Sequence, residues 1–228
     1  MNRRHSLKAG AALVTGLTLI PVVKSAGENI ASQTEDSFWE VVKNRRSVRA
    51  FKSDPVPKAD LEKIVDAARM APTAGNQQPW KFLVITDKNK IEALKAEKLK
   101  EVEAYLTDTK KLEGKELKKQ IKEYDKQLTS GYLSAPAYIV VLTDNNSRYP
   151  EYNHWDGPLA AGNLMLAARA LGYGTVHITD SISEELTRKV FNIPDHYTRV
   201  CITPVGIPFE WPEKEKQPLG DFVVSNSF

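Results

Sequence analysis

The feature that most constrains this chain is the segment 156–171, which is apolar on nearly every side of the helix that it predicts. Leucine, methionine and alanine fill most of its positions, and Gly162 permits close approach of another helix. A helix that is apolar all round must be enclosed by protein. In a chain of 228 residues, which has room for one sizeable core, the segment is therefore either a central helix or a helix clasped by a second subunit.

The rest of the chain alternates between helical and strand patterns. Residues 137–142 form a continuous apolar run, typical of a strand buried on both faces. Residues 87–131 interleave lysines and acids with apolar residues at helical spacing, which predicts two amphipathic helices joined near Glu113-Gly114. Further strands are expected at 81–86, 175–179 and 198–205, and further helices at 37–44, 58–71 and 184–191. The sequence therefore predicts one α+β domain over residues 37–228.

The first 36 residues differ from the rest of the chain. A basic start with Arg3 and Arg4 precedes an apolar stretch shorter than a membrane span, and small residues follow at Ser25 and Ala26. We interpret residues 1–25 as a twin-arginine signal peptide cut after Ser25. Residues 26–36 are then a linker. The alternative to a signal peptide is an amphipathic or frayed N-terminal arm. A working signal predicts a periplasmic or otherwise exported protein without a stable membrane span after processing, and a failed one predicts a cytoplasmic protein.

Charge and cysteine content exclude several classes of function. Without residues 1–25, which hold four basic residues and no acid, the formal charge falls from +3 to −1. The domain therefore has no net basic field to attract nucleic acid. A single cysteine, Cys201, excludes an intramolecular disulfide, and its apolar strand context indicates a small buried side chain. Neither a zinc-type ligand spacing nor a Gly-x-Ser-x-Gly nucleophile elbow occurs, so we predict no metal site.

One polar turn, residues 45–51, suits a phosphate group. Arg45, Arg46 and Arg49 supply forked donors that match phosphate oxygens two at a time, and Ser47 adds a hydroxyl donor. Taken alone, this pattern also fits a solvated helix end.

A second polar turn, residues 72–80, suits a flat polar ring. Asn76 and Gln78 each carry a donor and an acceptor, which a ring with alternating C=O and N–H groups requires. Taken alone, these residues also fit an ordinary turn. The helix between the two turns is expected to bring them together, so that one end of a common site takes a phosphate and the other takes a ring.

The two turns together make the chain resemble the FMN-dependent nitroreductase family. The first matches the family's Arg-x-Ser-x-[Arg/Lys]-x-Phe signature and the second its Pro-x-x-x-Asn-x-Gln-Pro-Trp signature, at the usual separation. The resemblance covers roughly residues 38–228. It implies FMN as the cofactor and an α+β fold: a mostly antiparallel sheet of four or five strands flanked by helices. It also implies an intertwined homodimer with two sites at the interface.

The same resemblance assigns the phosphate to two separate segments. Arg45, Arg46 and Ser47 would bind it from the first turn, and Lys214 and Lys216 from the C-terminal tail, where the family has a pair of basic residues before a proline.

The flavin ring, by the same resemblance, lies near three other segments. Asn76 and Gln78 would face it, from the same chain as the arginine turn, and Arg49 would stabilise the charge of the reduced ring. The residues over its reactive edge would be His177, Ile178 and Thr179, where the family often has Trp-Ile-Gly-Gly. This chain has Thr179 and Asp180 in place of the two glycines, and His177 could instead be a core histidine.

The expected roof of the site is the segment 87–131, with part of the roof coming from the second subunit. Its substrate-stacking candidates, each with packing as the alternative, are Tyr105, Tyr124 and Tyr132. The implied activity is two-step reduction of a nitroaromatic, quinone or similar small electrophile through bound FMN, with NAD(P)H as donor in the cytoplasm and a protein or quinol donor after export. The alternatives are a flavin-binding carrier or sensor without turnover, and a reductive dehalogenase or flavin-cleaving enzyme of the same family.

Overall fold

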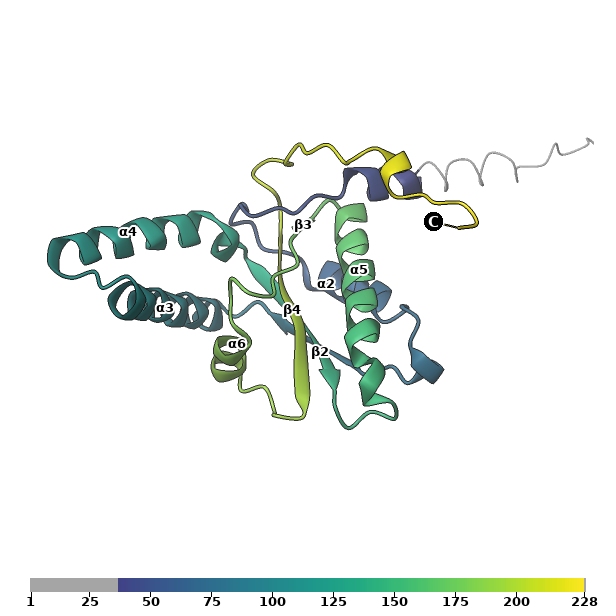
Figure 1. Cartoon of the computed structure of the whole chain (residues 1–228), viewed down its shortest axis with the longest axis horizontal. Coiled ribbons are helices and arrows are strands. Elements are labelled where there is room, and N and C mark those ends of the chain that lie inside the picture. The colour runs from purple at the N-terminus through teal and green to yellow at the C-terminus, as the bar shows by residue number, and fades with distance from the viewer. Residues whose placement is uncertain (1–36, 228) are drawn as a thin grey trace, which may run out of the picture. The chain divides into compact units, whose positions relative to one another are not determined.

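An antiparallel sheet forms the middle layer of residues 37–227, which are the residues that the computed structural model describes (Figure 1). Within this range four strands pair in the order β1-β2-β4-β3. Their bounds are Trp80–Ile85 for β1, Ala137–Asp144 for β2, Gly174–Thr175 for β3 and Tyr197–Gly206 for β4. The predicted antiparallel sheet is confirmed. The predicted signal peptide and linker, residues 1–25 and 26–36, lie outside the described residues.

The strand β3 is shorter than the expected segment 175–179. After Thr175 the chain leaves the ladder, and pairing returns only as a single bridge between Ile178 and Ile202. The other strands lie within two residues of their predicted bounds, because their apolar runs are long enough to define them locally.

Alternate residues of β2 face two separate cores. Tyr138 and Val140 point into one core, and Ile139 and Val141 point into the other, as the period of two in a strand requires. All of these side chains are fully buried. The predicted burial of β2 on both faces is therefore confirmed, and the sheet is covered by helices on each side.

A different set of helices covers each face of the sheet. On one face lie α2, Lys58–Ala68, and α5, Asn153–Ala170, which share the core of Ile139. On the other face lie α3, Lys88–Ala104, α4, Gly114–Ser130, and α6, Glu184–Phe191. Residues 37–44 are also helical. The hydroxyl of Ser183 caps α6 by accepting a hydrogen bond from the amide of Leu186, and the helix keeps its predicted bounds.

The helices α3 and α4 form an arm that extends from the sheet (Figure 1). A π-helical turn, Tyr105–Thr109, follows α3, and Gly114, in the left-handed region at φ 58°, begins α4. The predicted junction near Glu113-Gly114 is confirmed. Among the residues of α4 only Leu128 is buried, so most of this helix faces solvent in the described chain.

The chain covers α5 on one side only. Ala160, Ala161 and Leu164 are buried against the sheet and α2, whereas Trp155 remains 57% exposed and Leu159 48% exposed. An apolar surface of this kind is typical of an interface. Of the two expectations for the apolar segment, the structure therefore favours a helix that a second subunit covers. Among residues 37–227, none of the helices combines the length and the apolar composition that crossing a bilayer requires.

Burial of Cys201 leads to a simple test of the fold. Its thiol is fully buried, and desolvation raises its pKa to about 12. Because thiolate is the reactive form, we expect no reaction of the folded protein with a disulfide reagent such as Ellman's reagent at mildly alkaline pH. The chain contains one cysteine, so unfolding in concentrated guanidinium chloride should release one thiol per chain. Rapid labelling before unfolding would contradict the described packing of β4.

Candidate functional site

The arginine turn is fastened to the β3 edge of the sheet. The amide of Val48 donates to the carbonyl of Thr175 at 2.9 Å, and Ser47 forms a parallel bridge with the same residue. Val48 and Phe51 are buried, which fixes the backbone between them. This support holds the arginine side chains of the turn at a defined place on the surface.

Three of the predicted phosphate ligands line one cavity of about 660 Å³. They are Arg46, Lys214 and Lys216. Arg169 adds a fourth cation, whereas Glu213 and Glu215 are the carboxylates that line it. The excess of positive charge favours an anionic group in this cavity.

Arg46, which lines this cavity, has one side-chain donor without a partner in the described chain. Its Nη1 donates to the carbonyl oxygens of Lys43 and of Arg45, the latter at 3.0 Å. Its Nε is buried and has no hydrogen-bond partner among the described residues. Leaving a buried donor unpaired costs about 1–3 kcal/mol. A phosphate oxygen would supply the missing acceptor, so the residues present fit the phosphate end of a mononucleotide.

The tail that carries the two lysines is held against the C-terminal end of α5. The guanidinium carbon of Arg169 lies 3.9 Å from the centroid of the Trp211 ring, in a cation–π contact. The sequence reasoning missed both residues. A signal was present, because Arg169 is the only charged residue in α5 after Asp156.

The remaining residues of the arginine turn lie beside this cavity without lining it. Arg45 and Ser47 are half-buried, and Arg49 is exposed. The Nη1 of Arg49 donates to the carbonyl of Ser47 at 3.3 Å. The structure thus brings Arg46 together with the tail and leaves Arg49 free to reach outward from the same turn.

The second polar turn has an unusual backbone. Gly75, Asn76 and Gln78 all adopt positive φ, at 53°, 54° and 50°. A side chain at Gly75 would also place its Cβ 2.7 Å from the ring of Tyr149, so glycine is required there by space as well as by conformation. The side chains of Asn76 and Gln78 are exposed, and the Nε2 of Gln78 donates to the Oδ1 of Asn76 at 3.2 Å.

A residue that the sequence reasoning passed over, Gln77, fastens this turn to the N-terminal end of α5. Its Nε2 donates to the Oδ2 of Asp156 at 2.8 Å and to the carbonyl of Tyr149 at 3.0 Å, and its Oε1 accepts from the amide of Tyr149 at 2.8 Å. Asp156 also accepts from the amide of Ala74 through Oδ1, at 3.1 Å. The residues on both sides of Gly75 and Asn76 are therefore bound to one buried carboxylate.

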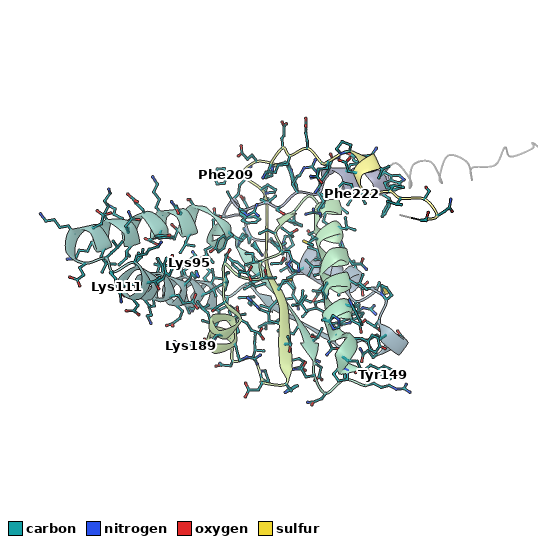
Figure 2. All side chains as sticks on the ribbon, viewed as in Figure 1. Lys95, Lys111, Tyr149, Lys189, Phe209 and Phe222 are labelled. Atoms are coloured by element: carbon teal, nitrogen blue, oxygen red, sulfur yellow. The ribbon has the colours of Figure 1, made fainter. Side chains whose placement is uncertain are left out.

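The expectation that the two turns meet within one chain is wrong. The second turn is bound to Asp156, and the phosphate cavity is lined by Arg169. Thirteen residues of one helix separate these two contacts, which at about 1.5 Å per residue is about 20 Å. Figure 2 shows the two ends: Tyr149 marks the second turn, and Phe209, whose amide donates to Ala50, marks the arginine turn. The helix α5 holds the two turns apart.

The segment after β3 also differs in part from expectation. His177 and Thr179 are exposed, so the alternative of a core histidine is wrong. Partial desolvation and the nearby Arg199 cation lower the pKa of His177. Ile178 is buried, and its amide donates to the carbonyl of Ile202 at 3.2 Å, so this amide is already paired with β4.

The position of this segment depends on Arg199, a residue outside the predicted motifs. Its guanidinium donates to the carbonyl oxygens of Thr179 at 2.5 Å and of Ile182 at 2.7 Å, and to the Oγ1 of Thr187 at 3.1 Å. Arg199 therefore ties the loop that follows β3 to the start of α6.

The three tyrosines of the expected roof have different environments. Tyr105 is exposed on the arm, and Tyr124 packs against the core of α3 and α4. Tyr132 is half-buried and donates to the carbonyl of Ser181 at 3.3 Å. Packing explains Tyr124, and Tyr105 stays a candidate for contact with a substrate.

Comparison with known proteins identifies the family. The family model described as "Nitroreductase family" matches residues 42–207, more than half of the chain. A protein of Methanothermobacter thermautotrophicus, provisionally named NADH dehydrogenase/NAD(P)H nitroreductase, is 30% identical over 76% of this chain and 78% of its own length. The iodotyrosine deiodinase of Thermotoga neapolitana is 30% identical over 82% of this chain and 96% of its own length. A crystal structure of iodotyrosine deiodinase bound to FMN and 3-iodo-L-tyrosine superimposes with a TM-score of 0.65 at 26% identity, over 84% of this chain and 100% of the other. This chain belongs to the nitroreductase family.

Proposed function

We propose that this protein is an FMN-dependent oxidoreductase whose site is shared between two copies of the chain. The observation that carries the proposal is the Arg46 cavity, which combines an unpaired buried donor with Lys214 and Lys216. One protomer would bind the phosphate there. Because the turn of Asn76 lies at the far end of α5 in the same chain, the ring would be bound by the partner's Asn76 and the partner's Gln78.

The homodimer is supported by apolar surfaces that one chain leaves open. Trp155 and Leu159 are exposed on α5. The C-terminal tail exposes Phe222 (Figure 2). It also exposes Val223, and the edge strand β1 exposes Val84. Large exposed apolar groups in several places indicate surfaces that are covered in an assembly. A second copy would cover them while supplying the missing half of the site.

Bound FMN supplies two-electron transfer, and the side chains supply position and charge. Arg46, Lys214 and Lys216 neutralise the phosphate and fix its end of the cofactor. Arg49 extends from the same turn and would offer a cation to the reduced ring, which carries negative charge. A charge-assisted hydrogen bond contributes about 1.5–3 kcal/mol, which raises a two-electron potential by about 30–60 mV.

The substrates proposed are small electrophiles: nitroaromatics and quinones. Similarity to the Thermotoga deiodinase over nearly all of its length supports reductive dehalogenation as a second candidate. In that reaction two electrons and a proton replace a halide on an aromatic ring with hydrogen. NAD(P)H is the proposed donor if the protein remains in the cytoplasm, and a protein or quinol is the donor if it is exported.

Purification of the chain is the first test. We expect a yellow protein whose extracted chromophore is FMN. Reduction with dithionite followed by a nitroaromatic, a quinone or a halogenated phenol should show rapid reoxidation by at least one of them. A flavin that none of these acceptors reoxidises faster than oxygen does would favour a carrier or sensor. Colourless protein that does not bind added FMN would contradict the proposal itself.

Export is tested separately. We expect that replacing Arg3 and Arg4 by lysine retains the protein in the cytoplasm, because the twin-arginine machinery reads the arginine pair. Fractionation of cells that produce each version makes the comparison. The same location for both would exclude this route.

A further inference from the structure

Asp156 is a buried carboxylate whose oxygens both face the second polar turn. It is 3% exposed, and within residues 37–227 no basic side chain lies at ion-pair distance from it. It lies in the first turn of α5, where the unpaired amides of the helix favour a negative charge. Its two acceptors are used by Ala74 and Gln77, which are the two residues that flank Gly75 and Asn76.

The segment between these two anchors is one that needs support. Gly75 and Asn76 both have positive φ, and Gln78, directly after the second anchor, has positive φ as well. Residues with a side chain seldom adopt this conformation, and it persists where surrounding contacts impose it. The carboxylate of Asp156 provides such contacts from a rigid helix, 79 residues further along the chain than Gln77.

We propose that Asp156 is a positioning residue for the ring of the cofactor. Through Ala74 and Gln77 it sets the backbone that presents Asn76 and Gln78. This inference rests on the proposed function, because it takes the ring to be the group that these two amides meet. Asp156 itself would touch neither the cofactor nor the substrate.

The substitution Asp156→Asn tests this role with little change in volume. The introduced asparagine would offer one acceptor, so it can keep the bond from the amide of Ala74, but its amino group would then oppose the Nε2 of Gln77. We expect the Kd for FMN to rise by about tenfold or more, the effect of one charge-assisted hydrogen bond. Because the turn serves the ring, the Kd for riboflavin, which lacks the phosphate, should rise by the same factor.

The comparison of FMN with riboflavin separates an effect at the ring from an effect at the phosphate, and a control variant separates positioning from general destabilisation. Asp60→Asn is the matched control: Asp60 accepts a hydrogen bond from the hydroxyl of Tyr173 at 2.7 Å and does not contact the turn. It should lower the temperature of unfolding without changing either Kd. If Asp156→Asn also lowers only the unfolding temperature, Asp156 is structural and the inference is wrong.

If the single variant folds poorly, a double variant that exchanges the carboxylate and the amide between positions 77 and 156 provides a second test. Gln77→Glu alone would place two carboxylates in contact and weaken FMN binding. In the double variant with Asp156→Asn, the introduced glutamate would accept a hydrogen bond from the introduced asparagine, so the bond returns with its direction reversed. We expect the double variant to bind FMN more tightly than Gln77→Glu, and purely additive losses would overturn the inference. Failure of the unaltered protein to bind FMN would instead contradict the proposed function.

Discussion

Protein carrying Arg46→Ala is expected to bind FMN roughly 10- to 150-fold more weakly than the unaltered protein. Arg46 lines the cavity beside Lys214 and Lys216, and its buried Nε has no hydrogen-bond partner within residues 37–227. Losing a charge-assisted hydrogen bond costs about 1.5–3 kcal/mol, which corresponds to this range of affinity. Titration of the apoprotein with FMN, followed by quenching of flavin fluorescence, measures the change. Riboflavin has no phosphate, so its Kd should not change.

Two further variants limit the interpretation of Arg46→Ala. Arg46→Lys keeps the charge but not the fork, and should bind FMN with an affinity between the other two proteins. Arg69→Ala removes an exposed arginine of similar size that pairs with Asp66 on the surface, and should leave FMN binding unchanged. An equal loss for FMN and riboflavin in Arg46→Ala would show that the cavity does not hold the phosphate.

Replacing Leu159 by glutamate is expected to convert the protein to colourless monomers. Leu159 is exposed in one chain, on the uncovered side of α5. In a dimer that buries this side, an unpaired carboxylate would be desolvated at a cost of several kcal/mol. Because the ring and the phosphate would be bound by different protomers, dissociation removes half of each site. Light scattering after gel filtration and the ratio of flavin to protein absorbance should therefore change together.

The control for this variant adds the same charge elsewhere. Ala96→Glu places a glutamate on an exposed position of α3 and should yield a yellow dimer. A monomeric Leu159→Glu protein that retains bound FMN would show that one chain holds the cofactor alone. A dimeric, yellow Leu159→Glu protein would show that the interface lies elsewhere.

Local pattern was enough to predict most of the elements, because their burial follows directly from the order of residues. The apolar run of β2 and the helix at 184–191 are both evident in the sequence and both present in the structure. The strand at 175–179 was not predicted well. Its partners on β4, Val205 and Gly206, are distant in sequence, and only Gly174 and Thr175 join the ladder with them. Later in the segment, Ile178 forms only an isolated bridge with Ile202.

The sequence indicated several residues of the candidate site, but the arrangement predicted for its two turns was wrong. Arg46, Lys214 and Lys216 line one cavity. The charge of the arginine turn indicated Arg46, and the resemblance to the family indicated the two lysines. The separation of Asn76 from Arg46 follows from which end of α5 each segment meets, and no local pattern specifies that. Gln77 and Arg199 were missed for a related reason: they act through hydrogen bonds to residues far along the chain, such as Asp156.

Under the proposed arrangement, the length of α5 determines when a chain can bind its cofactor. A newly made monomer would carry two half-sites too far apart to complete each other. It could bind its flavin cofactor only after meeting a second copy of the chain. The absorbance of bound flavin would then measure dimerisation. Dilution would release the cofactor as the dimer dissociates. A variant that dimerises poorly would contain little flavin even where riboflavin phosphate is abundant.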